Sequence, residues 1–260
     1  MSGPAPRTRC HIIVGGTAGM GAAAARQLLC DGDRVAIIGR DPDRAGAVAA
    51  ALSDGALGDG SDAGGLAAAI GRCIERLGRI DGLAVTAGPI HSRGDVLTLT
   101  DEDWAESFET QLMTTVRAIR AVLPTMIAQG EGSIVTLSAY SIRSPKPVLT
   151  HYAAMKSAIV TLTKSIAKSH GADGIRANCI APGAIATEAL DGARKAAASA
   201  GAGDDNAALW QVMRDQWGMK AALDRIGEPQ DVGELIAFLL SSRARYMTGA
   251  LINIDGGTDF

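Results

Sequence analysis

Residues 11–21 read HIIVGGTAGMG, a short apolar run that leads directly into closely spaced glycines. The run HIIV is β-branched and has no polar alternation beyond its first residue, as in a strand of a sheet that is covered on both faces. Gly15, Gly19 and Gly21 then allow a sharp turn and a close approach of a pyrophosphate to the N-terminus of the next helix, whose free N–H groups attract anions. The order strand, glycine turn and helix predicts a dinucleotide site; the alternative is a glycine-rich turn without chemistry.

The same alternation of strand and helix continues along the chain. The apolar runs predict further strands at 34–40, 82–88, 132–138, 176–183 and 249–255. Segments of helical length and pattern lie at 21–31, 42–53, 62–78, 101–129, 150–170 and 229–241. The alanine-rich segment 188–224 also reads as helical, with an interruption at SAGAGDDN. This alternation predicts one α/β domain with a parallel sheet covered by helices on both faces.

Composition excludes several classes of protein. The chain has 260 residues, of which 47% are hydrophobic, and a net charge of −3 without a basic stripe, so we expect no nucleic-acid partner. Residues 1–9 contain no apolar signal core, and no apolar run reaches the roughly 18 residues of a membrane span. We therefore expect a cytoplasmic protein without a membrane partner, with a flexible lead at 1–9 and a single domain at 10–260. The four cysteines form no CxxC pair, so we expect no metal site.

Tyr152 and Lys156 are candidate catalytic residues. They are four residues apart in the predicted helix 150–170, so their side chains share a face. A cation next to a phenol favours the phenolate and lowers its pKa from about 10 toward working pH. Such a phenol is suited to act as general acid and base between a ketone and a secondary alcohol.

The second predicted strand ends at Gly39 and Arg40. A site specific for NAD places an acidic residue here to bind the ribose 2′-hydroxyl, whereas an arginine suits the 2′-phosphate of NADP. Gly39 is not acidic and Arg40 follows it, so we expect NADP(H) to be favoured over NAD(H). The alternative is that Arg40 is a solvated turn residue, because Asp41-Pro42 begins a helix directly after it.

These motifs together resemble the short-chain dehydrogenase/reductase family. The resemblance covers about residues 10–257 and rests on four motifs: the glycines of 15–21, Tyr152-xxx-Lys156, PGAIAT at 182–187, and the closing RIGEPQDVGELIAFLLSSRARYMTGALINIDGG. It implies a doubly wound sheet of the Rossmann type, a nicotinamide cofactor and hydride transfer at a carbinol carbon. It also implies a homodimer or homotetramer built through long helices, and a lid at about 188–224 that closes over a carbonyl or alcohol substrate.

The resemblance further implies which residues hold the cofactor. Asp59 would lie near the adenine, Ala87 and Gly88 would line the ribose, and the segment 182–187 would cradle the nicotinamide. The predicted cofactor site comprises Gly15, Thr17, Gly19, Met20, Gly21, Arg40, Asp59, Ala87, Gly88, Tyr152, Lys156, Pro182, Gly183, Ile185 and Thr187.

The chain departs from the family pattern at the active site. The usual catalytic serine falls on Ala139, whether one counts forward from Gly132 or back from Tyr152. Gln111 stands where an asparagine normally helps to hold a water in a proton relay through the lysine. The chain also has Val-Thr-Ala-Gly at 85–88 in place of Asn-Asn-Ala-Gly.

Two serines are candidates to replace the missing hydroxyl. Side chains alternate along an extended chain, so Ser141 points the same way as Ala139, and we expect Ser141 to be the better candidate. Ser138 would serve only if the backbone twists or bulges at this point. The alternative is that both hydroxyls only satisfy nearby backbone groups.

Two functions remain open from the sequence. The first is an NADP(H)-dependent oxidoreductase whose catalytic residues come from Tyr152, Lys156, Ser141, Ser138 and Gln111. The second is a cofactor-binding protein with weak or no reductase activity and a regulatory or structural role. The intact tyrosine and lysine favour the first function, whereas the alanine at the serine position and the glutamine at the asparagine position favour the second.

Overall fold

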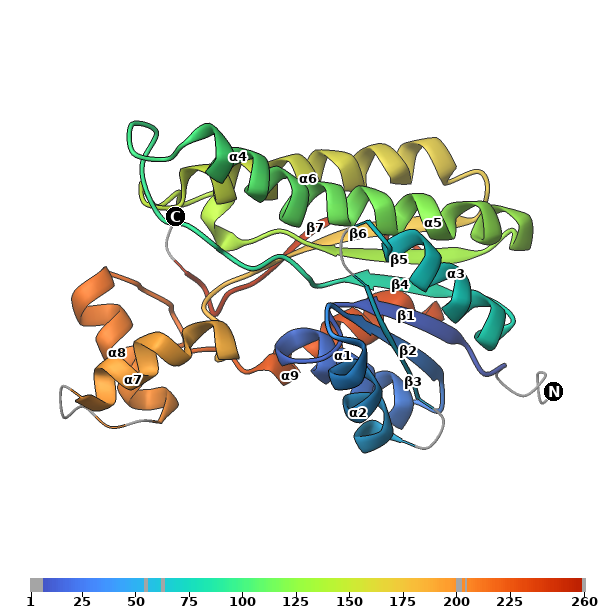
Figure 1. Ribbon diagram of the computed structural model, residues 1–260, viewed down its shortest axis with the longest axis horizontal. Helices are drawn as coiled ribbons and strands as arrows, with labels where there is room; N and C mark the ends of the chain where they lie inside the picture. Colours follow the sequence, from blue (N-terminus) through green and yellow to red (C-terminus); the bar gives the residue numbers. More distant parts are fainter. Residues whose placement is uncertain (1–6, 54–55, 62–63, 200–202, 204, 259–260) are drawn as a thin grey trace.

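A computed structural model describes residues 7–53, 56–61, 64–199, 203 and 205–258 of the chain. Its seven strands form one parallel sheet in the order β3-β2-β1-β4-β5-β6-β7 (Figure 1). The strands are β1 Cys10–Val14, β2 Arg34–Gly39, β3 Leu57–Gly60, β4 Gly82–Val85, β5 Gly132–Leu137, β6 Ile175–Pro182 and β7 Leu251–Ile254. The strand order reverses between β1 and β4, which confirms the predicted doubly wound sheet and places its ligand crevice at their carboxyl ends.

Helices cover both faces of this sheet, as predicted (Figure 1). One face packs against α1 Gly19–Cys30, α2 Pro42–Leu52 and α9 Pro229–Leu240. The other face packs against α3 Leu66–Leu77, α5 Thr114–Gln129 and α6 Thr150–His170. The predicted strands and helices are therefore confirmed to within a few residues at their ends, and β3 is the one strand that the sequence did not predict.

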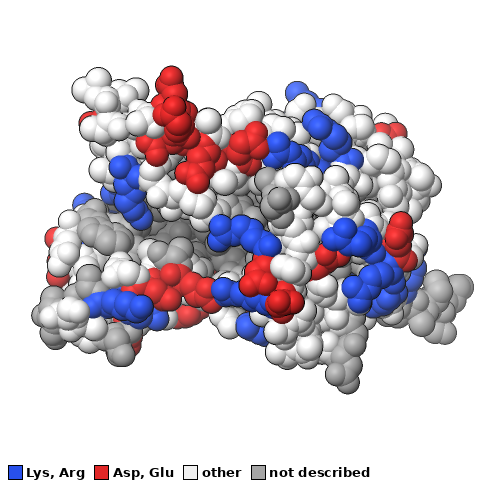
Figure 2. Space-filling model, in the orientation of Figure 1, with Lys and Arg blue, Asp and Glu red and all other residues white. Residues whose placement is uncertain are grey.

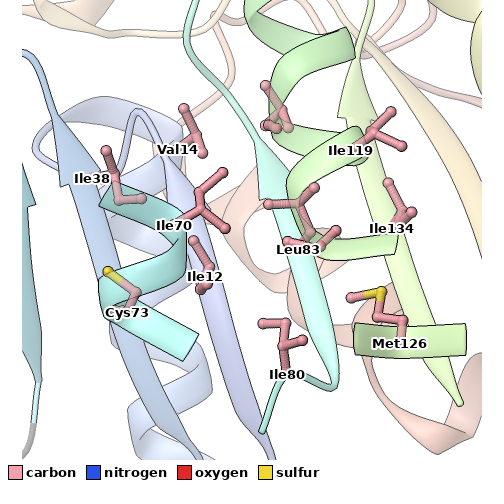
Figure 3. Close-up of a cluster of buried hydrophobic side chains, with 14 of the residues drawn as sticks. Ile12, Val14, Ile38, Ile70, Cys73, Ile80, Leu83, Ile119, Met126 and Ile134 are labelled. Atoms are coloured by element: carbon pink, nitrogen blue, oxygen red, sulfur yellow. The ribbon is translucent and has the colours of Figure 1, made fainter. Parts of the chain in front are cut away.

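Adjacent residues of a strand pack into the hydrophobic clusters on opposite faces of the sheet. Ile12 of β1 belongs to the cluster with α3 and α5, whereas its neighbour Ile13 belongs to the cluster with α1 and α9. Figure 3 shows the first cluster, in which Ile70 and Ile119 reach down from two helices onto the strands. Because both faces of each strand are buried, the strands read as unbroken apolar runs.

The predicted helix 101–129 is interrupted in the structure. It consists of α4 Asp101–Ser107, a π-helical segment Phe108–Met113 and then α5. A capping box formed by Thr100 and Asp103 begins α4. The π-helical segment contains Gln111, and insertions of this kind are frequent at functional sites.

The segment 188–224 contains two helices that stand apart from the sheet, at the left of Figure 1. They are α7 Asp191–Ser199 and α8 Asn206–Trp217. Leu209, Trp210 and Met213 of α8 form a small cluster of their own, against which Tyr140 packs. The predicted interruption at 199–206 falls between the end of α7 and the start of α8, and residues 200–202 and 204 of it lie outside the described part of the chain.

The predicted lead 1–9 lies mostly outside the described residues. Where it is described, it is held in place: Arg7 contacts the carboxylate of Asp81 at 2.7 Å, and Arg9 contacts Glu131 at 2.7 Å. The fully buried carboxylate of Asp81 needs a cationic partner such as Arg7, and the flexibility of the lead stays a prediction. Within the part of the chain that the structure describes, no helix combines the length and the apolar character that crossing a membrane requires.

The glycine turn after β1 packs tightly against the end of β4. Gly15 has φ +88°, and a Cβ there would lie 2.6 Å from the backbone nitrogen of Ala87. A Cβ at Gly21, on the first turn of α1, would overlap the carbonyl oxygen of Gly15 and lie 2.5 Å from Oγ1 of Thr86. These glycines are therefore required by close backbone packing as well as by the turn itself.

Substitution of Gly21 should destabilise the fold by distorting this turn. We expect Gly21→Ala to lower the free energy of unfolding by about 1–3 kcal/mol, the usual cost of overpacking. Gly46→Ala is the control, since Gly46 lies in α2 with no heavy atom within 4 Å of the place that a methyl group would take, and it should raise stability by about 0.4–1 kcal/mol. Urea denaturation monitored by circular dichroism measures both values. Equal effects of the two substitutions would contradict the close packing described above.

Candidate active site

The carboxyl ends of β1 and β4 are joined by the side chain of Thr86. Its hydroxyl lies 3.1 Å from the carbonyl oxygens of both Val14 and Gly15, and it can donate to either one. Thr86 thus fixes the start of the glycine turn relative to β4. The sequence did not predict this structural role; its one signal was that Thr86 departs from the family pattern at 85–88.

The glycine turn and the segment after β6 face each other at this edge of the sheet. Gly19 has φ +50°, and a Cβ there would lie 3.2 Å from Cγ2 of Thr187. At the N-terminus of α1, Ala18 provides no side-chain cap, and the first turn contains no acidic residue. Free N–H groups at the start of a helix suit the pyrophosphate of a dinucleotide, so the residues present fit this group.

The end of β2 explains why the chain has no acidic residue at position 39. A Cβ at Gly39 would lie 2.6 Å from Cγ2 of Thr17, so a larger side chain there would displace the threonine. Arg40 follows with an exposed side chain, and among the described residues it has no ion-pair or hydrogen-bond partner. Its guanidinium is therefore available to an anionic ligand.

Asp59 has a partner of its own at the end of β3. Its carboxylate accepts from Nε of Arg72 at 2.9 Å and from Nη2 of the same arginine at 2.7 Å. These bonds to Arg72, together with one from the backbone N–H of Gly60, hold the pKa of Asp59 below its usual value. The predicted place of Asp59 near the adenine stays a prediction.

Lys156 and Tyr152 lie close together on α6, as predicted. Nζ of Lys156 is 5.5 Å from the centroid of the Tyr152 ring and donates to the carbonyl oxygen of Leu137 at 3.0 Å. In return, the hydroxyl of Ser138 donates to the carbonyl oxygen of Lys156 at 2.9 Å. These two bonds join the end of β5 to α6, one through the side chain of Lys156 and the other through its backbone carbonyl.

Burial controls the ionisation of both residues. It lowers the pKa of Lys156 to about 8, because the buried ammonium group loses hydration. It raises the pKa of Tyr152 above its ordinary value, and the neighbouring phenol of Tyr140 adds to this effect. The predicted role of Lys156 in lowering the pKa of Tyr152 stays a prediction, because the raised pKa arises from burial and from Tyr140 while the amine donates to Leu137.

The backbone changes direction between Ala139 and Ser141. Ala139 is extended, with φ −159°, but a 3₁₀ helix, Tyr140–Ile142, begins directly after it. Ser141 therefore no longer follows the alternation on which its selection depended, and this part of the prediction is wrong. Its buried hydroxyl, which has no hydrogen-bond partner among the described residues, lines an open cavity of about 350 Å³ with Ala154 of α6.

Gln111 lies against the loop that follows β4. Its Nε2 donates to the carbonyl oxygen of Pro89 at 2.5 Å, and its Oε1 covers Gly88, where a Cβ would overlap it. Oε1 is buried and accepts no hydrogen bond from the described residues. Gln111 shares a small cavity with Tyr152, so the structure does bring these two predicted residues together.

The predicted crevice is visible on the surface. Figure 2 shows this face hollowed between the part that contains α4 and α6 and the part formed by α7 and α8. Basic and acidic side chains both occur around the hollow, so neither sign of charge dominates it. This arrangement agrees with a small-molecule site between the sheet and the segment 188–224.

Comparisons with known proteins agree with this geometry. The family model described as enoyl-(acyl carrier protein) reductase matches residues 15–259. The chain is 32% identical to the short-chain reductase protein NovJ of Streptomyces niveus and 32% identical to meso-2,3-butanediol dehydrogenase of Serratia marcescens, each match covering 95% of this chain and 92% of the relative. The 7alpha-hydroxysteroid dehydrogenase of Bacteroides fragilis is 33% identical over the same shares of the two chains.

Solved structures are similar over nearly the whole chain. The structure of levodione reductase superimposes with a TM-score of 0.84 at 26% identity and covers 96% of this chain and 98% of its own. A short-chain dehydrogenase/reductase from Mycobacterium ulcerans gives a TM-score of 0.83 at 26% identity, with 97% and 92% covered. The protein therefore belongs to the short-chain dehydrogenase/reductase family and is an NAD(P)-dependent oxidoreductase.

Proposed function

We propose that this oxidoreductase uses NADP(H) to interconvert a ketone and a secondary alcohol, with Tyr152 as general acid and base. The observation that carries the proposal is the position of Tyr152 on α6, its ring centroid 5.5 Å from Nζ of Lys156, at the edge of the sheet where the glycine turn lies. A bound nicotinamide would supply or accept the hydride. Two relatives are named for substrates of this class, a butanediol and a hydroxysteroid.

In the proposed mechanism, the phenol of Tyr152 gives its proton to the carbonyl oxygen during reduction and takes it back during oxidation. Burial opposes ionisation of this phenol, so positive charge must come close to it before the phenolate forms. Lys156 supplies such a charge below its pKa of about 8, and its bond to Leu137 holds the amine near the ring. The proposed role of Lys156 is therefore to hold position and charge beside Tyr152.

A second hydroxyl donor for the carbonyl oxygen is missing from this arrangement. Ala139 has none, Ser138 already donates to Lys156, and Ser141 lies in the 3₁₀ helix after Ala139. Loss of one such donor costs about a hundredfold or more in turnover. The alternative function, a cofactor-binding protein with weak or no turnover, is supported by this gap and by the raised pKa of Tyr152.

We propose NADP(H) as the preferred cofactor on the basis of Arg40 and Gly39. An exposed guanidinium that is free of carboxylate partners among the described residues can form a charge-assisted bond to the 2′-phosphate. A carboxylate side chain at position 39, which would hold a free 2′-hydroxyl, would have to displace Thr17.

We also propose that the protein assembles as a homodimer or homotetramer in the cytoplasm and that the segment 188–224 closes over the substrate. Val96 and Leu97 are 68% and 90% exposed beside α4, and Phe108 is 41% exposed at the end of that helix. Exposed apolar side chains of this size are typical of interfaces between subunits. The small separate core of α8 would allow it to move as a unit.

Turnover with NADPH tests the proposed function. We expect a panel of small aliphatic and alicyclic ketones to include at least one that is reduced at the expense of NADPH absorbance, with a low turnover number. Tyr152→Phe should lower that rate by about a hundredfold or more, because it removes the phenol that supplies the proton. NADPH binding without turnover on any ketone would instead support the alternative function.

Two substitutions separate the roles of the hydroxyl groups. Ala139→Ser restores a donor at the extended end of β5 and should raise turnover about tenfold to a hundredfold. Ser141→Ala serves as its counterpart and should leave the rate unchanged, since Ser141 lies in the 3₁₀ helix after Ala139 and not at the extended end of β5. If Ser141→Ala loses activity and Ala139→Ser gains none, Ser141 is the donor after all and our assignment of the two positions fails.

The proposed preference for NADP(H) depends on the positive charge of Arg40. We expect Arg40→Ala to weaken NADPH binding about tenfold, the low end for a single charge-assisted contact, and to leave NADH binding unchanged. Arg26→Ala removes an exposed arginine of α1 and controls for the change in net charge. Fluorescence titration of each protein with both nucleotides gives the dissociation constants. Equal affinities for both nucleotides in the parent protein would contradict the assignment.

A further inference from the structure

A cavity of about 10 Å³ lies between the loop after β4, α4 and α6, with Tyr152 in its wall. This volume has room for about one water molecule. Two buried atoms of its lining residues have no hydrogen-bond partner among the described residues, Oε1 of Gln111 and Nδ1 of His151. A buried polar atom lowers stability unless it forms a hydrogen bond. Two such atoms on residues that line one small cavity indicate that a hydrogen-bonding molecule occupies it.

The partners of Gln111 identify its unpaired atom as an acceptor. The amide group faces the carbonyl oxygen of Pro89 at 2.5 Å, and a carbonyl oxygen can only accept. The nitrogen of the amide must therefore face Pro89, which leaves the oxygen free. A ligand in the cavity must donate a proton to this oxygen.

The partners of His151 identify its unpaired atom in the same way. Nε2 of His151 lies 3.1 Å from Oγ of Ser92, and the Ser92 hydroxyl also bonds to the carboxylate of Asp103. The bonds from the Thr100 backbone and from Ser92 hold the pKa of Asp103 below its usual value, so its carboxylate is ionised and only accepts. Ser92 then donates to Asp103 and accepts from Nε2–H, which leaves Nδ1 of the neutral imidazole with a free lone pair.

One water molecule would satisfy both atoms, because it has two protons to donate and both atoms accept. Its oxygen would keep its lone pairs free to accept from Tyr152. Besides its bond to Ser92, the imidazole of His151 contacts the ring of Trp104 edge-on, with the ring centroids 6.1 Å apart. This contact helps to fix the orientation of the imidazole. With this water in place, Tyr152, His151, Ser92 and Asp103 would form a continuous chain of proton donors and acceptors from the active site toward the surface of α4.

We propose that His151 is a proton-relay residue that exchanges the proton of Tyr152 with solvent through this chain; the proposal rests on the function proposed above. During alcohol oxidation, the proton on Tyr152 passes to the water, and a proton of the water passes to Nδ1. The Nε2 proton then moves to Ser92, whose own proton moves to Asp103 and leaves to solvent. These transfers leave the imidazole proton on Nδ1, and the imidazole returns to its Nε2–H form by exchanging that proton with solvent before the next turnover. Ketone reduction runs the same transfers in reverse from the Nδ1–H form.

The surroundings of His151 suit this role. Burial lowers its pKa and Asp103 partly opposes that effect, so the imidazole is neutral and able to accept a proton at neutral pH. The other titratable groups that line the cavity are Tyr152, Asp103, His91 and Glu106. His91 lies 3.7 Å from Glu106 on the outer side, and so has a carboxylate partner separate from Asp103.

Chemical rescue tests the relay. With saturating NADP⁺ and alcohol, His151→Ala should lower kcat about tenfold or more, with KM little changed, and added imidazole should restore kcat in proportion to its concentration. His170→Ala is the matched control, because His170 ends the same helix and pairs with Asp173 at 2.9 Å. That control should keep the parent kcat and show no response to imidazole.

Two further measurements keep the proposal falsifiable if His151→Ala folds poorly. Ser92→Ala keeps the imidazole but removes its link to Asp103, and should lower kcat several-fold with unchanged NADPH affinity. Nitrogen-15 NMR of the parent protein, which needs no substrate, should show neutral His151 with its proton on Nε2. A proton on Nδ1, or an unchanged kcat in both variants of an active enzyme, overturns the relay alone. A parent protein without any turnover overturns the proposed function and the relay with it.

Discussion

The bond from the buried amine of Lys156 to the carbonyl oxygen of Leu137 is the interaction on which the active site depends. It joins the end of β5 to α6, and the return bond from Ser138 to the Lys156 carbonyl fixes the rotation of that helix. Tyr152, one turn earlier on α6, is thereby placed at the edge of the sheet where the glycine turn and Thr187 meet. The return bond also engages the Ser138 hydroxyl, which is therefore not free to act as the missing donor. Burial, together with the neighbouring Tyr140, raises the pKa of Tyr152.

Most of the fold could be predicted because its signals are local. Strands such as β1 are buried on both faces and read as unbroken apolar runs, and α6 was predicted with its observed ends. The strand β3 was missed because its sequence, LGDG, contains two glycines and no β-branched residue; its pairing with β2 gives it its conformation. The π-helical segment around Gln111 was missed for a related reason, since one extra residue in a turn leaves no pattern in the sequence.

The candidate site was predicted where short motifs define it and missed where it depends on packing. The glycine turn, Tyr152 and Lys156 carry their spacing in the sequence, and the structure brings them to one edge of the sheet. The preference for Ser141 depended on an extended backbone, which ends at Ala139. The contact of His151 with Ser92 joins residues 59 positions apart, so no local pattern could indicate it.

The central claim is that burial suppresses the ionisation of Tyr152 until positive charge is placed beside it. Ultraviolet titration of tyrosinate measures this directly, when the spectrum of Tyr152→Phe is subtracted from that of the parent to remove Tyr140 and Tyr246. We predict no ionisation of Tyr152 up to about pH 10 in the protein alone, and an apparent pKa at least about two units lower with saturating NADP⁺, whose nicotinamide ring is positively charged. An apparent pKa that is the same with and without NADP⁺ would contradict the account.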